Sequence, residues 1–98
     1  MGVVIDPEGA ETRILREMVD LKGADVVEMG CGDGRLTWRY ARRTRSVLGI
    51  DPNDGAIERA RASTPKRLRP AVTFEVGEAA RVQLPAGSFD VGILSWSL

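Results

Sequence analysis

The 98-residue chain contains no histidine and a single cysteine, Cys31. Histidine is the usual side chain for acid and base catalysis near neutral pH and a common zinc ligand, so histidine-based acid/base chemistry and the usual zinc sites are excluded. One cysteine excludes an internal disulfide and a thiolate metal cluster, which suits a reducing compartment. We therefore expect no metal site and no nucleophilic role for Cys31, because no histidine or lysine stands near it in the sequence to activate the thiol.

Long apolar runs and a net charge are missing as well. No stretch approaches the roughly 20 residues of a membrane-spanning helix, and the first residues lack the pattern of a signal peptide. Fourteen basic and fourteen acidic residues cancel, so no overall field draws the chain to nucleic acid or to an acidic membrane. These absences predict a cytoplasmic protein whose partner is neither a nucleic acid nor a membrane.

Short apolar runs alternate with helical patterns along the chain, as in a single small domain. The expected strands cover residues 25–30, 46–50, 72–76 and 89–94, and the expected helices cover residues 6–20, 35–44 and 55–63. This alternation predicts an α/β fold with a doubly wound, mainly parallel sheet in the strand order 3-2-1-4. The first and fourth strands then adjoin where the winding reverses, and ligands bind at the carboxyl ends of the strands there.

The sheet is expected to stop after its fourth strand, because the sequence ends four residues later. That strand would be a bare apolar edge, and an unpaired edge invites pairing with another chain. The pattern therefore predicts a homodimer formed through the fourth strand.

Three glycines follow the first predicted strand at alternate positions, Gly30, Gly32 and Gly34. They leave a bend lined by backbone amides, which a ligand can approach closely. A phosphate-binding P-loop is excluded, because it needs a lysine after its glycines and both lysines of the chain lie elsewhere. The spacing also differs from the Gly-x-Gly-x-x-Gly pattern of dinucleotide-binding folds.

Carboxylates surround this bend. Glu28 and Asp33 place negative charge at the bend, which opposes a pyrophosphate and favours a cation. Asp51 ends the second predicted strand, where a carboxylate can accept both hydroxyls of a ribose. The residues therefore predict a nucleoside that carries a positive centre and no pyrophosphate.

Together these motifs resemble the class I S-adenosylmethionine-dependent methyltransferases. Residues 28–34 are similar to the first motif of the family, residues 49–51 to its acidic second-strand end, and residues 76–91 to its third and fourth strand region. The resemblance implies a Rossmann-like fold, S-adenosyl-L-methionine as cofactor, and methyl transfer. A small-molecule acceptor is expected, because residues 95–97 differ from the Asn-Pro-Pro-Tyr type of sequence that the family uses for amino groups of bases or glutamine.

The resemblance also implies a set of cofactor-binding residues. These are Glu28, Gly30, Cys31, Gly32, Asp51, Pro52, Glu78 and Ala79. The backbone of the bend would hold the methionine end, with Glu28 near the ammonium group, and Asp51 would take the ribose hydroxyls. Glu78 would take the adenine amino group, and the amide of Ala79 a ring nitrogen. No residue is predicted to be catalytic.

Other interpretations stay open. Asp51 could cap the following helix, Glu28 could pair with an arginine, and Glu78 could be a solvated loop carboxylate. Two other functions fit part of the pattern: a fragment of an NAD-dependent oxidoreductase, and a non-catalytic binding module that pairs through its sheet edge. The family has seven strands, so we expect residues 1–98 to be one partial, truncated domain that binds the cofactor, and its status as an enzyme stays open.

Overall fold

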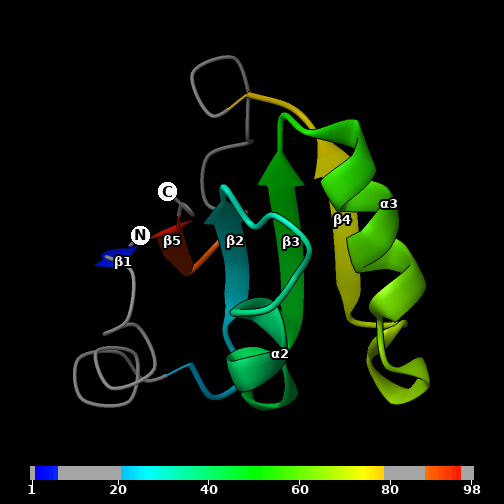
Figure 1. Ribbon diagram of the computed structural model, residues 1–98. Coiled ribbons are helices and arrows are strands. Elements are labelled where there is room, and N and C mark those ends of the chain that lie inside the picture. Colours follow the sequence, from blue (N-terminus) through cyan, green and yellow to red (C-terminus); the bar gives the residue numbers. More distant parts are fainter. Residues whose placement is uncertain (1, 7–20, 79–87, 96–98) are drawn as a thin grey trace.

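The chain folds into a parallel sheet with helices packed against it (Figure 1). This computed structural model describes residues 2–6, 21–78 and 88–95. In chain order the described elements are β1 (Gly2–Asp6), β2 (Asp25–Met29), α2 (Thr37–Tyr40), the 3-10 turn η1 (Ala41–Arg43), β3 (Ser46–Asp51), α3 (Asp54–Ser63), the 3-10 turn η2 (Lys66–Leu68), β4 (Val72–Val76) and β5 (Val91–Ser95).

The strands lie side by side in the order β1-β5-β2-β3-β4, and all described pairs are parallel. Leaving β1 aside, this is the predicted order 3-2-1-4, which is confirmed. The winding reverses between β2 and β5, so the carboxyl ends of β2 and its neighbours form the edge where doubly wound folds bind ligands.

The predicted boundaries agree best where a strand is short, apolar and bounded by turn residues. β4 covers the predicted residues 72–76, and β2 and β3 differ from prediction by one residue. The helix predicted over 35–44 is shorter in the structure, where α2 covers Thr37–Tyr40 and the 3-10 turn η1 follows it. The hydrogen bonds at both ends of this region are of the tighter 3-10 type, from Arg39 N to Leu36 O and from Thr44 N to Ala41 O. The helix predicted over 6–20 lies outside the described residues except for Asp6, which ends β1.

The prediction of a bare fourth strand is wrong. β1 pairs in parallel with the outer side of β5, from Gly2 opposite Val91 to Asp6 opposite Ser95. Residues 3–5, an apolar run that lies outside the expected strands, belong to this strand. Because the amides and carbonyls of β5 are engaged on both sides, the dimer predicted through that edge loses its physical basis.

Both described helices cover the same face of the sheet (Figure 1). The strands β2, β3 and β4 are neighbours in the sheet in the same order as in the chain, so the two connections between them cross the sheet the same way. Right-handed connections that cross the same way place their helices on one face of the sheet. Ile57 and Ala60 of α3 are fully buried against this face, together with Phe74 of β4.

At the centre of this face, glycines allow unusually close packing. The ring of Trp38 meets the ring of Phe74 edge-on, with the centroids 5.5 Å apart. A Cβ atom at Gly49 would lie 2.6 Å from the Phe74 ring and 3.0 Å from the Cys31 Sγ, and one at Gly34 would lie 2.7 Å from the Trp38 ring. Glycine at these positions lets β3 and the loop after β2 lie directly on the aromatic pair.

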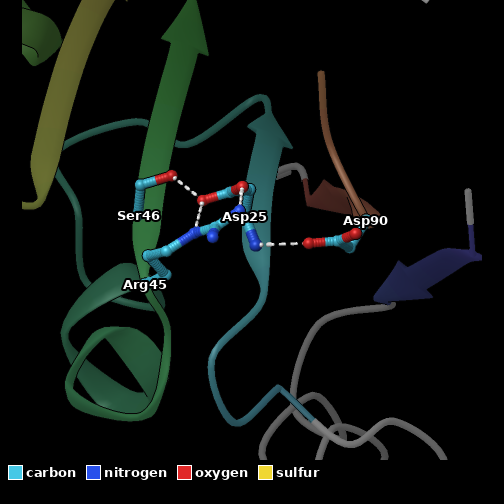
Figure 2. A network of polar contacts seen from close by, with 4 residues as sticks. All are labelled: Asp25, Arg45, Ser46 and Asp90. Carbon is cyan, nitrogen blue, oxygen red and sulfur yellow. Dashed lines mark hydrogen bonds and ion pairs between the residues drawn. The ribbon is translucent and has the colours of Figure 1, made fainter. Parts of the chain in front are cut away.

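A polar network ties the amino ends of three strands together (Figure 2). Asp25, at the start of β2, accepts hydrogen bonds from Arg45 Nε at 2.9 Å and from Ser46 Oγ at 2.7 Å, and it forms an ion pair with the same guanidinium. Its backbone N–H donates to the Asp90 carboxylate at 2.9 Å, and the Asp90 N–H donates to the Asp25 carbonyl at 2.8 Å. This network fixes the register at the end of the sheet away from the glycine loop.

We expect Gly49→Ala to destabilise the fold by about 1 to 3 kcal/mol, because the added methyl group overpacks the Phe74 ring. Gly55→Ala is the matched control. Its Cβ would meet only the flexible end of Arg59 and the Asn53 side chain at 3.3 to 3.4 Å, and alanine favours the helix by about 0.5 to 1 kcal/mol. Urea unfolding of both variants measures the difference, and equal stabilities would contradict the packing described.

The hydrogen bonds from Arg45 and then Ser46 lower the pKa of Asp25 to about 2. The unfolded carboxyl titrates near 3.9, so the stabilisation is fully present above about pH 4 and is lost as the pH falls toward 2. Asp25→Asn should therefore be less stable than the wild type at pH 7, and the two should converge between pH 4 and pH 2. Urea unfolding at several pH values tests this, and a stability difference that stays the same from pH 7 to pH 2 would contradict it.

Candidate functional site

The glycine loop after β2 adopts the backbone that its sequence predicts. Gly30, Gly32 and Gly34 all have positive φ angles, of 78°, 57° and 91°, which side chains with a Cβ rarely adopt. The N–H groups of Gly30 and Cys31 donate to the Ile50 carbonyl of β3 at 2.7 and 3.2 Å. The loop is therefore tied to the neighbouring strand at its first turn.

Gly32 differs from its neighbours in what surrounds it. A Cβ atom at Gly34 would collide with Trp38, whereas one at Gly32 would meet nothing within 4 Å. The middle of the loop is therefore open backbone at the carboxyl end of the sheet.

Asp51, the last residue of β3, holds the loop from the side. Its Oδ2 accepts a hydrogen bond from Gly32 N at 2.9 Å, and its Oδ1 accepts one from Asn53 N, also at 2.9 Å. The open interpretation that Asp51 caps α3 is not what the structure shows, since the Asn53 side chain accepts from Ala56 N at 3.0 Å and fills that role. A carboxylate has about four acceptor positions, and the two backbone bonds leave capacity on this half-buried group.

Glu28 lies beneath the loop, inside the protein. Its side chain is 0% exposed, and its Oε1 accepts hydrogen bonds from Thr37 Oγ1 at 2.7 Å and from Tyr40 OH at 2.5 Å. The sequence interpretation missed both hydroxyl partners. Their spacing of three residues on a predicted helix, directly after the loop, is a signal that could have found them.

The electrostatics of the loop are those of a buried, acidic environment. Burial, followed by the charge of Glu28, raises the pKa of the Tyr40 hydroxyl well above its usual value. Burial likewise raises the pKa of the Cys31 thiol, and the charges of Glu28 and Asp51 raise it further. Cys31 is thus a small buried residue that fits the bend, with a thiol that stays protonated at neutral pH.

Two further predicted site residues lie at the surface. Pro52 and Glu78 are exposed. The N–H of Gly77 donates to the Asp51 carbonyl at 3.0 Å, which brings the segment that follows β4 to the end of β3. Ala79 lies outside the described residues. Asp33, on the loop, pairs with the exposed Arg35 at 3.2 Å.

The described part of the chain contains neither a membrane-spanning helix nor a cluster of metal-ligating side chains. No helix in it has the length and hydrophobicity to cross a membrane. Its histidine, cysteine and acidic side chains form no group of three or more that could hold a metal ion.

The fold and the geometry of the site define a class of protein. A doubly wound sheet, an open glycine loop after β2 and a carboxylate at the end of β3 are typical of proteins that bind a nucleoside at the carboxyl ends of the strands. A family model described as a methyltransferase domain matches residues 26–98. The chain therefore belongs to the class I S-adenosylmethionine-dependent methyltransferase family, as the motifs predicted.

Individual relatives agree with this assignment. The chain is 38% identical, over 81% of its own length, to magnesium-protoporphyrin O-methyltransferase of Rhodobacter capsulatus. It is 36% identical, over 78% of its length, to a probable ribosomal RNA small subunit methyltransferase A of Pyrobaculum aerophilum. It spans about a third of each relative, 34% and 32% respectively.

A solved structure shows the same fold. The crystal structure of an S-adenosylmethionine-dependent methyltransferase from Mesorhizobium loti superposes with a TM-score of 0.75 at 31% identity, over 89% of this chain and 39% of that one. The cofactor predicted from the motifs, S-adenosyl-L-methionine, is therefore the cofactor of the family to which this chain belongs.

The raised pKa of Cys31 predicts slow alkylation. At pH 8 the native thiol should react with iodoacetamide at least about ten times more slowly than the same thiol in unfolding concentrations of urea, because the thiolate is the reactive form. Cys31 is the only cysteine in the chain, so the loss of free thiol reports on this site alone. Equal native and unfolded rates would contradict the buried, acidic surroundings described.

Proposed function

We propose that this chain binds S-adenosyl-L-methionine over the glycine loop and forms the cofactor-binding part of a methyltransferase. The observation that carries the proposal is the pairing of open backbone at Gly32 with the half-buried Asp51 carboxylate, which accepts the Gly32 N–H at 2.9 Å. The backbone at Gly32 leaves space for a ligand, and the Asp51 carboxylate offers a hydrogen-bond acceptor beside that space.

The charge of the site favours this ligand over a dinucleotide. Glu28, Asp33 and Asp51 are all on or beside the loop, and the described hydrogen bonds of its first two amides run to the Ile50 carbonyl. A pyrophosphate would face these carboxylates without the amide cradle that a helix N-terminus normally supplies. A sulfonium and an ammonium would instead be attracted by them.

Each predicted contact has a group that could make it. The remaining acceptor positions of Asp51 would take the ribose hydroxyls, with Pro52 beside it at the surface. Glu78 would reach the adenine amino group, since Gly77 is bonded to Asp51. The backbone around Gly30, Cys31 and Gly32 would face the methionine portion.

When bound, this cofactor supplies an electrophilic methyl group. The chain's own part is then to hold that group and its neighbours in place, and positioning alone can supply several kcal/mol of a transfer barrier. Tyr40 and Cys31 are not suited to act as general bases, because both are buried with raised pKa values. The acceptor would supply the nucleophile.

A small-molecule acceptor is the favoured substrate class. It rests on residues 95–97, which differ from the sequence used for bases, and on the similarity to an O-methyltransferase named for magnesium-protoporphyrin. The ribosomal RNA relative provides the contrasting case, but the balanced charge of this chain favours a small acceptor over a polyanion. The same proposal places the chain in a reducing, cytoplasmic setting, where the Cys31 thiol stays free.

Calorimetry with S-adenosylmethionine, S-adenosylhomocysteine and NAD tests the proposal. We expect the first two to bind and NAD not to bind. Binding of NAD alone would instead support a fragment of an NAD-dependent oxidoreductase. If none of the three ligands binds, the result would support a non-catalytic binding module.

Asp51→Asn should weaken S-adenosylhomocysteine binding by about ten- to a hundredfold, because hydrogen bonds to a charged group are worth about 1.5 to 3 kcal/mol. Asp54→Asn is the control. Asp54 lies three residues away in the first turn of α3 and is exposed. Equal weakening by the two variants would contradict the assigned role of Asp51.

A further inference from the structure

Three buried side chains, Glu28, Thr37 and Tyr40, are hydrogen-bonded to one another's groups below the glycine loop and join its two ends. We call this cluster the bracket. Glu28 is the next-to-last residue of β2, and Thr37 is the first residue of α2. The hydroxyls of Thr37 and Tyr40 both donate to Glu28 Oε1, at 2.7 and 2.5 Å. The whole loop runs between the residues joined in this way.

The bracket is sealed from solvent. Glu28 and Thr37 are 0% exposed and Tyr40 is 3% exposed. A carboxylate is costly to bury, and an apolar side chain of similar size often stabilises a core at least as well. Val26 and Val27 of the same strand are such residues. Packing alone therefore does not account for a glutamate at this position.

What the bracket does constrain is the shape of the loop. The loop contains three glycines with positive φ angles, and glycine has the largest backbone freedom of any residue. Asp51 holds Gly32 from the side, and the bracket holds the two ends of the loop from below. These two anchors restrain the backbone on either side of Gly32.

We infer that Thr37 and Tyr40 are positioning residues, which act through Glu28 to fix the glycine loop for the cofactor, and that Glu28 itself supplies a buried negative charge that favours the sulfonium cofactor over its demethylated product. The inference rests on the proposed function. It adds two hydroxyl residues to the site, and it gives Glu28 a role beneath the loop in place of a solvent-facing contact.

The charge of Glu28 also acts on Cys31, a residue of the loop. The thiol lies in the middle of the loop, and the charge of Glu28 is the largest electrostatic contribution to its raised pKa. The negative potential of Glu28 therefore reaches the loop on which the ligand would lie. S-adenosylmethionine carries one positive charge more than S-adenosylhomocysteine, so a charge at this place distinguishes the two.

The positioning role is tested with Thr37→Val and Tyr40→Phe, which each remove one hydroxyl and keep the shape. We expect each to weaken the binding of both ligands about tenfold, as the loss of one hydrogen bond to a charged group would. Thr64→Val is the matched control, since the Thr64 hydroxyl is also buried and donates to the Ala60 carbonyl at 2.8 Å, at the far end of α3. It should lower stability to urea by a similar amount and leave the dissociation constants unchanged.

The charge role is tested with Glu28→Gln and Glu28→Asp. The glutamine variant removes the charge, so the ratio of the dissociation constant of S-adenosylmethionine to that of S-adenosylhomocysteine should rise at least about threefold. The aspartate variant keeps the charge but is one methylene group shorter. It should therefore weaken the binding of both ligands and leave the ratio of their dissociation constants unchanged. An unchanged ratio in the glutamine variant would overturn the charge role.

The failures can be told apart. If the wild-type chain binds neither ligand, the proposed function is wrong and the inference falls with it. If the wild type binds, but Thr37→Val and Tyr40→Phe bind as tightly as Thr64→Val, the proposed function stands and the positioning role is wrong. The two hydroxyl variants decide the positioning role whether or not the Glu28 variants fold.

Discussion

The hydrogen bond from Gly32 N to Asp51 Oδ2 joins the two halves of the site. Gly32 lies at the open middle of a loop made of residues with little conformational preference, and Asp51 ends the neighbouring strand β3. The bond exists only because β2 and β3 are parallel and in register, with Glu28 opposite Gly49 and Met29 opposite Ile50. A shift of one residue would carry the carboxylate away from the loop and turn it to the other face.

The two ends of the sheet have different kinds of polar contact. At the amino end, the Asp25 carboxylate is paired with the Arg45 guanidinium and the Ser46 hydroxyl, and the Asp25 backbone is paired with Asp90 (Figure 2). At the carboxyl end, Asp51 accepts two backbone N–H groups and keeps acceptor capacity. The first arrangement stabilises the register of the strands, and the second leaves a charged group beside open space, as a binding site requires.

Sequence reasoning predicted best what depends on local pattern. Strand β4, the helix α3 and the order of the four strands β5-β2-β3-β4 follow from apolar runs, turn residues and the handedness of crossovers. It failed for β1, because three apolar residues in a row occur before helices as often as in strands. The pairing partner, the outer edge of β5, is what makes this run a strand, and that edge exists only in the folded sheet. It also failed for the end of the helix predicted over 35–44, where the loop geometry and 3-10 bonds prevail over propensity.

The sequence by itself determined the family, the positions of the glycines and the carboxylate at the end of β3, because these depend on residue type and spacing. Only the tertiary structure decided where the carboxylates point. Glu28 and Asp51 look alike in the sequence, each near the end of an apolar strand, yet Glu28 turns inward to Thr37 and Tyr40 and Asp51 turns to Gly32. Alternation places both side chains on the same face of the sheet, since Glu28 lies opposite Gly49 and Asp51 follows two residues later. Their positions along the strands make the difference, because Glu28 lies within β2 and under α2, whereas Asp51 is the last residue of β3 and lies beside the loop.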